Sequence, residues 1–127
     1  MPTSTDPLLA RLLEALEGEL APAVELRHRL HALPELAHAE ERTAEAVVER
    51  MPVKCANAAG TGRIARIGRD GGRAVGVRAE LDGLPLQERT DAPFSAREGT
   101  MHACGHDVHM AALVALEIGR ASCRERV

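Results

Sequence analysis

The chain has 127 residues, of which 45% are hydrophobic and 28% are charged, with a formal net charge of −3. This length fits one globular domain and excludes two of ordinary size. The weak negative charge and a single aromatic residue, Phe94, argue against a nucleic-acid partner, which needs basic surface or base-stacking rings. No apolar run approaches the roughly 20 residues of a membrane span. We therefore expect a cytoplasmic protein with no membrane partner, whose three cysteines are free thiols or metal ligands rather than disulfides.

Three helices are predicted at the start of the chain. The first begins at Pro7, capped by Thr5 or Asp6, and carries leucines at helical spacing as far as Leu20. Proline fits a first helical position because its missing N–H would have no helical partner there. Gly18 weakens the end of this helix.

A second proline is expected to separate the first helix from the next. Pro22 opens the second helix, and Pro34 ends it. A third helix is predicted over residues 39–51, where apolar side chains recur on one side: Ala44, Val47, Val48 and Met51.

Short apolar runs separated by glycines predict a β-hairpin after the helices. Its strands are expected over residues 63–67 and 74–81, joined by a turn at 69–72. The alternation of the second strand places three polar side chains on one face: Arg78, Glu80 and Asp82. A loop over residues 83–100 follows, and Asp107 is expected to cap a final helix.

The last ten residues, 118–127, break the apolar pattern of that final helix. They read Ile-Gly-Arg-Ala-Ser-Cys-Arg-Glu-Arg-Val, with three arginines and no cap. Back-translated, they match in frame a widely used short-read sequencing adapter. We therefore expect that residues 118–127 are not native and that Cys123 has no function.

The densest chemical segment runs from Met101 to His109 and contains one thiol, three imidazoles and one carboxylate. Cys104 and His106 are two residues apart, so in an extended segment their side chains would project to the same side, with Gly105 letting the chain bend around an ion. Because a catalytic zinc site usually has three protein ligands, these two are an incomplete set. The candidates for supporting these ligands are Asp107 and His109.

Two other interpretations of this segment stay open. Cys104 can be a small buried residue with histidines packed around a helix start. It can also be a nucleophile paired with a histidine, although no residue is evidently placed to orient the imidazole. The clustering favours metal binding over both.

Two further segments carry polar residues whose roles the residues alone leave open. Asp82 can accept a hydrogen bond from a ligating imidazole while Arg78 neutralises it, or both can belong to a solvated strand face. Residues 27–35 contain basic side chains that an ordinary helix end explains. Four histidines remain unassigned: His28, His31, His38 and His102.

Taken together, three segments resemble one known family. Residues 27–36, 77–88 and 101–109, in this order and spacing, resemble the amino-terminal part of the metal-dependent aminoacylase/carboxypeptidase family. The closest branch is the amidohydrolases of the hippurate hydrolase, indoleacetyl-amino-acid hydrolase and N-acetyldiaminopimelate deacetylase type. In two places the chain departs from the family pattern, with Glu80 in place of the commoner Asp and Gly83 in place of the commoner Ala.

The resemblance implies an α/β fold, in which residues 1–117 are the amino-terminal part of a mixed-sheet, zinc-peptidase-like catalytic domain. It implies a hydrolase that cleaves the amide bond of an N-acyl amino acid or small peptide with two divalent metal ions, zinc or manganese first, and cobalt or nickel next. Cys104 and His106 match the family's metal ligands, and Asp82 matches an acidic position that supports the site. The full-length protein of this branch often dimerises through an inserted smaller domain.

The family's catalytic glutamate, further ligands and substrate-binding domain lie beyond the matching segments. We therefore expect that this chain is inactive by itself, because the general base that activates water is missing from it. The alternative is a binding module that holds a metal or a partner through Cys104 and His106 without chemistry.

Overall fold

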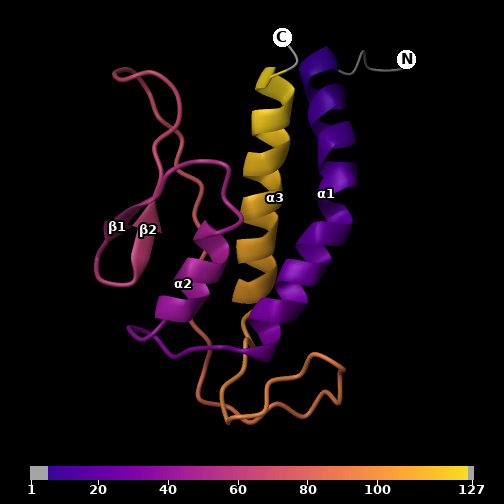
Figure 1. Cartoon of the computed structure of the whole chain (residues 1–127), viewed down its shortest axis with the longest axis vertical. Helices are drawn as coiled ribbons and strands as arrows, with labels where there is room; N and C mark the ends of the chain where they lie inside the picture. Colours follow the sequence, from indigo (N-terminus) through magenta and orange to yellow (C-terminus); the bar gives the residue numbers. More distant parts are fainter. Residues whose placement is uncertain (1–5, 126–127) are drawn as a thin grey trace.

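The computed structural model describes residues 6–125, which form three helices and one short hairpin. In chain order the elements are α1 (Pro7–Ala32), α2 (Glu41–Val48), β1 (Ala56–Ala58), β2 (Gly62–Ile64) and α3 (His106–Glu125). Helices α1 and α3 lie side by side and run antiparallel, and α2 with the hairpin lies on the other side of α3 (Figure 1). The order of helices, hairpin and helix confirms the predicted α/β class.

Helix α1 is one continuous helix, so the prediction of two helices divided at Pro22 is wrong. Its start is as predicted, since Pro7 is the first residue and the Asp6 side chain accepts a hydrogen bond from the Leu8 N–H. Pro22 lacks the N–H that would bond to the turn before it. The helix continues through it because both halves of α1 pack on α3: Leu12 and Leu16 lie against Gly119, and Leu26 and Leu30 belong to the core.

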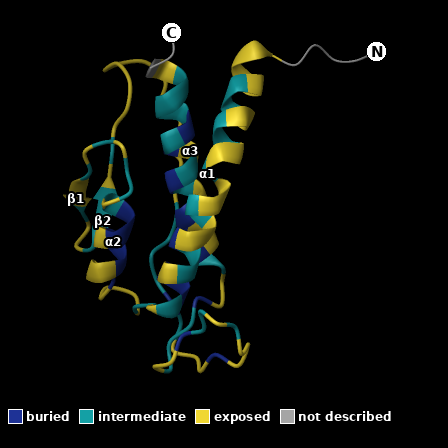
Figure 2. Ribbon diagram, turned by 45° about the vertical axis from the view of Figure 1, so that its right-hand side comes forward, coloured by how far each residue is buried: buried dark blue, intermediate teal, exposed yellow. Residues whose placement is uncertain are grey.

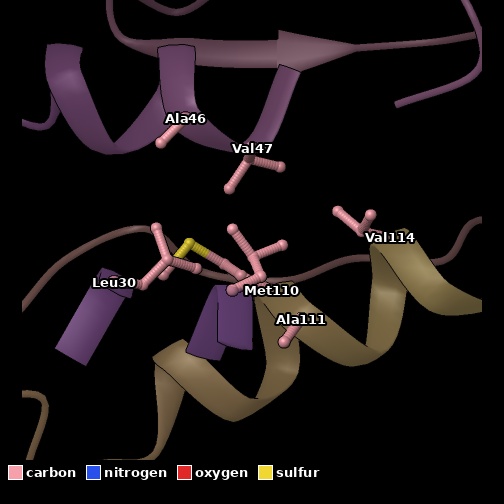
Figure 3. Close-up of a cluster of buried hydrophobic side chains, with 7 residues drawn as sticks. Leu30, Ala46, Val47, Met110, Ala111 and Val114 are labelled. Atoms are coloured by element: carbon pink, nitrogen blue, oxygen red, sulfur yellow. The ribbon is translucent and has the colours of Figure 1, made fainter. Parts of the chain in front are cut away.

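The core lies where α1, α2 and α3 meet and contains no aromatic side chain. Its buried members are Leu26, Leu30, Ala46, Val47, Met110, Ala111 and Val114. Figure 3 shows the α2 side chains facing Leu30 and the α3 residues, with Met110 between the helices. Buried positions concentrate in α2, in α3 and in the last turns of α1, whereas the first half of α1 is largely exposed or half-buried (Figure 2).

Glu35, in the turn after α1, fixes the start of α2. Its Oε1 accepts hydrogen bonds from the Thr43 N–H at 2.6 Å and from the Thr43 hydroxyl at 2.7 Å. Burial raises the pKa of Glu35, but the bonds from Thr43 and the nearby Arg42 outweigh it and lower the pKa below its ordinary value. An ionised carboxylate thus satisfies helix-start donors that would otherwise lack partners.

The hairpin forms earlier in the chain than predicted. β1 pairs with β2 in antiparallel register, with Ala56 opposite Ile64, and the turn contains Ala59 and Gly60 with φ of 49° and 81°. The predicted pairing of 63–67 with 74–81 is therefore wrong, although β2 overlaps its first strand. Val75 and Val77 are 92% and 60% exposed, so no apolar layer covers this part of the predicted pair, and only Ala79 and Leu81 of its second strand pack against the core. A two-stranded ladder without such a layer is marginal.

Two short backbone contacts hold the long segment before α3. The Gly83 N–H donates to the Glu35 carbonyl at 2.7 Å, and Leu84 and Met101 exchange two hydrogen bonds of 2.8 and 2.9 Å. The loop between Leu84 and Met101 therefore begins and ends at the same backbone bridge. These contacts bring the residue before Gly83, which is Asp82, to the start of α3.

Helix α3 continues to Glu125, beyond the point where the sequence pattern weakens. Arg11 donates to the Cys123 carbonyl at 2.9 Å and Arg120 forms two hydrogen bonds with Glu117. Among residues 6–125, none of the helices combines the length and apolar character that a membrane crossing requires.

Candidate metal centre

The chain turns sharply between the two predicted ligands. Gly105 has φ of 79°, in the left-handed region that glycine adopts without strain, and α3 begins at the next residue, His106. The expectation that Cys104 and His106 lie in an extended segment is therefore wrong, whereas the bend at the glycine is present. Cys104 is an exposed free thiol, and the His106 side chain is 19% exposed.

Asp82 holds the ring of His106 from one side. The His106 Nδ1 lies 2.9 Å from the Asp82 carbonyl oxygen and 3.1 Å from its Oδ1. Because both of these oxygens are acceptors, Nδ1 must be the protonated nitrogen. The lone pair of the neutral ring is then on Nε2, which is the tautomer that a metal ligand oriented by a second residue requires. A contact of the kind that Asp82 can make with an imidazole is thus present at His106, and the role of Asp82 beside a metal stays a prediction.

Two of the three polar residues predicted on one strand face, Glu80 and Asp82, lie near the first turn of α3. Glu80 and Asp82 are two residues apart in an extended segment, and His106 and His109 are three residues apart on a helix. The distance between the members of each pair is similar, so the two pairs can face each other. The His109 Nδ1 lies 3.8 Å from the Glu80 Oε2, and the two imidazole rings are 6.1 Å apart. His109 thus lies one turn beyond His106, as predicted, and its ring is near Glu80.

Arg78 does not neutralise Asp82. Its guanidinium lies 3.1 Å from the Glu80 carboxylate, and its side chain is 80% exposed. The prediction that Arg78 neutralises Asp82 is therefore wrong. The strand-like alternation brings the Arg78 side chain nearest to Glu80, which is two residues later in the chain.

Asp107 is a buried residue of the first turn of α3, not its cap. Its Oδ2 accepts a hydrogen bond from the Arg27 Nε at 2.7 Å and lies 2.8 Å from the His31 Nδ1. Both partners come from the last turns of α1. Asp107 has no hydrogen bond to Cys104 or His106 within the described residues, so any effect on those residues acts through the backbone.

The same histidine also contacts a second buried carboxylate. The His31 Nε2 lies 2.8 Å from the Glu88 Oε1, which also accepts a bond from the Thr90 hydroxyl, while the Glu88 Oε2 accepts from the Ala96 N–H at 2.6 Å. We call Arg27, His31, Glu88 and Asp107 the buried junction. It ties the long loop and the start of α3 to α1.

Both carboxylates of the buried junction are ionised. Burial raises the pKa of Glu88, but hydrogen bonds from Thr90, His31 and Ala96 outweigh it and lower the pKa to about 2. Burial likewise raises the pKa of Asp107, and the bonds and charges of His31 and Arg27 lower it below its ordinary value. Each ring nitrogen of His31 faces one of these carboxylates at 2.8 Å.

The sequence reasoning missed this junction. It assigned the basic residues near the end of α1 to the helix dipole. A signal was available: Arg27 and His31 are four residues apart and flank the apolar positions Leu26 and Leu30, so they continue the face that packs inward.

The remaining unassigned histidines have different surroundings. His28 stacks on Phe94 with ring centroids 3.8 Å apart, and His38 is exposed in a turn with φ of 68°. His102 is buried, and among the described residues its two ring nitrogens and the Asp107 Oδ1 have no hydrogen-bond partner. Burial lowers the pKa of His102 and outweighs the attraction of Asp107, so the neutral ring is favoured.

The donor chemistry of this region fits a divalent metal only in part. The Cys104 sulfur and the His106 Nε2 are donors that zinc and similar cations accept. Within residues 6–125, however, no group of three or more His, Cys, Asp or Glu side chains is arranged to hold an ion. The chain therefore offers two donors rather than a closed site.

Comparison with known proteins matches the same region. A model of peptidase family M20/M25/M40 matches residues 76–119. N-acetyldiaminopimelate deacetylase from Anoxybacillus flavithermus is 42% identical over 98 residues, covering 69% of this chain and 25% of that protein. N-acyl-L-amino acid amidohydrolase from Geobacillus stearothermophilus is 38% identical over 112 residues, covering 84% and 30%.

A solved structure agrees with these matches. A Bacillus subtilis protein described as a dinuclear metal binding peptidase from the M20 family superposes with a TM-score of 0.71 at 32% identity, covering 83% of this chain and 32% of that one. The chain spans between 25% and 32% of the length of these relatives.

The fold and the matches together define the class as metal-dependent hydrolases. Within that class, the chain belongs to peptidase family M20/M25/M40, and its similarity extends to amidohydrolases and deacetylases of small N-acyl compounds.

Proposed function

We propose that the protein containing this chain hydrolyses the amide bond of N-acyl amino acids or small peptides, with Cys104 and His106 as two of its metal ligands. The observation that carries this proposal is the double contact of the His106 Nδ1 with Asp82, which leaves Nε2 free on a residue two positions after the exposed thiol of Cys104. The names of the deacetylase and amidohydrolase relatives support the substrate class.

Each residue has a distinct part in this proposal. Cys104 and His106 would donate a sulfur and a nitrogen to the metal, and Asp82 orients the imidazole. A bound divalent cation polarises a carbonyl oxygen and activates water. Zinc and manganese are the cations we favour, followed by cobalt and nickel, since a thiolate and an imidazole suit all four to different degrees.

Cobalt binding tests the two ligands directly. We expect Co²⁺ to produce a thiolate-to-metal absorption band with the chain, and we expect Cys104→Ser and His106→Ala to remove or weaken it. Cys55→Ser is the matched control, because Cys55 is also a free cysteine but its Sγ lies 3.7 Å from the Val53 carbonyl, outside this region. A band that persists in Cys104→Ser and disappears in Cys55→Ser would refute the ligand assignment.

We also propose that the chain by itself does not hydrolyse these amides. Two protein donors are fewer than the three that catalytic sites usually have, so weak binding without turnover is expected. Metal-dependent release of benzoate from hippurate by the isolated chain would contradict this.

The origin of residues 118–127 remains a proposal, and it decides between an enzyme and a stand-alone binding module. We infer that these residues translate a sequencing adapter, and the in-frame match of their back-translation supports this. Resequencing the locus tests it. A continuing reading frame with an acidic pair and further histidines would support the enzyme, whereas genomic codons for 118–127 followed by a stop would support the module.

A further inference from the structure

The start of α3 is held by charged side chains from α1. The Asp107 side chain is 1% exposed, and its Oδ2 faces both Arg27 and His31 at 2.7 and 2.8 Å. Figure 1 shows the end of α1 crossing beside the first turn of α3, so these contacts join the two helices where the predicted ligands begin.

Arg27 is itself fixed in place. Its guanidinium carbon lies 4.8 Å from the centre of the Phe94 ring, while His28 stacks on the same ring. His31 is fixed by its second nitrogen, which contacts Glu88. Asp107 is therefore held by two donors that cannot readily move away, which is a stronger constraint than an ion pair between two mobile side chains.

This arrangement is an expensive way to stabilise a small domain. Taking two carboxylates out of water costs free energy that the attraction of their partners recovers only in part, and apolar side chains of similar size often do as well. A buried charged cluster of this kind is better explained by the position that it specifies, which here is the backbone beside His106.

The backbone around His106 is held by local hydrogen bonds: the Gly105 N–H donates to the His102 carbonyl, and the Gly105 carbonyl accepts from the N–H groups of Val108 and His109. Gly105 itself has a left-handed conformation with open space around the Cβ position, and Cys104 is exposed. On the other side, the His106 ring contacts only Asp82 among its hydrogen-bond partners in the described chain. A shift of Asp107 would therefore carry His106 with it and break the contact with Asp82.

We propose that Arg27 and His31 are positioning residues, which hold Asp107 and thereby fix the orientation of His106 toward the metal. This inference rests on the proposed function, because it assumes that His106 is a metal ligand. The orientation of the His106 ring can nevertheless be tested without metal. Among the described residues, neither Arg27 nor His31 has a hydrogen bond or ion pair with Cys104 or His106.

The tautomer of His106 is the direct readout. In the wild-type chain at a pH where the ring is neutral, ¹⁵N NMR should show the proton on Nδ1. In Arg27→Met and in the nearly isosteric Asp107→Asn, we expect the signal to move toward the Nε2–H-rich mixture of an unconstrained imidazole. We also expect Co²⁺ binding to weaken by about 10 to 100-fold in both variants.

Glu40→Gln is the matched control. Glu40 is another buried carboxylate, and its Oε2 accepts a hydrogen bond from the Thr61 hydroxyl at 2.7 Å, away from the buried junction. We expect this variant to keep the Nδ1–H tautomer even where its thermal stability falls. If Glu40→Gln moves the His106 signal as far as Arg27→Met does, general loosening explains the effect and the proposal is overturned.

Two other outcomes separate the two proposals. An unchanged His106 signal in folded Asp107→Asn would overturn the positioning role, whatever the metal affinity. A wild-type chain that shows the Nδ1–H tautomer but no thiolate absorption with Co²⁺ would overturn the ligand assignment, and the positioning of the ring would still stand on the NMR result.

Discussion

The buried junction and the segment of residues 66–78 are both rich in charge, but their surroundings differ. The carboxylates of Glu88 and Asp107 are 0% and 1% exposed and each has at least two donors. In the other region every residue from 66 to 78 is exposed, and the Arg66–Asp70 pair is 3.6 Å long with side chains 70% and 97% exposed. The comparison teaches that burial, rather than the number of charges, decides which pairs fix the fold.

The largest effect is expected for His31→Ala. This change leaves two buried carboxylates without one of their donors, so we expect the free energy of unfolding to fall by about 3 to 5 kcal/mol. Urea unfolding followed by circular dichroism measures it. The control is Arg29→Ala, which removes an exposed 3.6 Å pair with Glu49 and should cost under about 1 kcal/mol. Equal losses in the two variants would remove the distinction between the two kinds of pair.

A core truncation extends the comparison to apolar residues. Met110 is 1% exposed, so Met110→Ala should lower the free energy of unfolding by about 2 to 5 kcal/mol because it leaves a cavity. Val75 is 92% exposed, and Val75→Ala should change it by less than about 0.5 kcal/mol. The same urea titration tests both, and a large loss in Val75→Ala would show that its side chain is covered in solution.

Acid should weaken the buried junction over a defined range. The pKa of Glu88 is lowered from 4.5 to about 2, so its contribution to stability is complete above the unfolded value and is lost as the pH falls toward the folded value. The shift corresponds to roughly 3 kcal/mol. Unfolding free energies across this pH range should fall more steeply for the wild type than for Glu88→Gln. Parallel curves would mean that Glu88 is not stabilised as an anion.

The smallest effect concerns the glycine after Asp82. A Cβ at Gly83 would lie 2.9 Å from the Pro34 Cβ and 3.2 Å from the Thr100 Cγ2, so Gly83→Ala should cost about 1 to 3 kcal/mol. At Gly76 a Cβ meets open space, and Gly76→Ala should be neutral or stabilise by up to about 1 kcal/mol. Thermal unfolding of the two variants provides the measurement. A neutral Gly83→Ala would show that Pro34 moves aside at little cost. The family that this sequence resembles commonly has alanine at this position, which is consistent with such a movement.

Local sequence signals predicted the start of α1 and the common face of Glu80 and Asp82 better than they predicted the pairing of distant segments. Pro7 after Asp6 marks the start of α1, and the alternation of Glu80 and Asp82 predicted their common face. Pro22 was misleading because its local cost is opposed by packing of both halves of α1 on α3, which no window of sequence contains.

The buried junction was out of reach for a related reason. Its members come from three segments, and the contacts of His31 span 57 and 76 residues along the chain. Spacing along one helix indicates that Arg27 and His31 share a face, but not which carboxylates meet them. The hairpin was misplaced because the alternating residues Val75 and Val77 fit a strand pattern while no described apolar layer covers them.

The position of Phe94 makes the buried junction accessible to optical spectroscopy. The chain contains no tryptophan and no tyrosine, and this one ring lies between Arg27 and His28, with the His31 ring 5.5 Å away. A tryptophan introduced at this position would be the only indole of this 127-residue chain. Its fluorescence would report the loosening of the buried junction, with no background from other indoles in this chain.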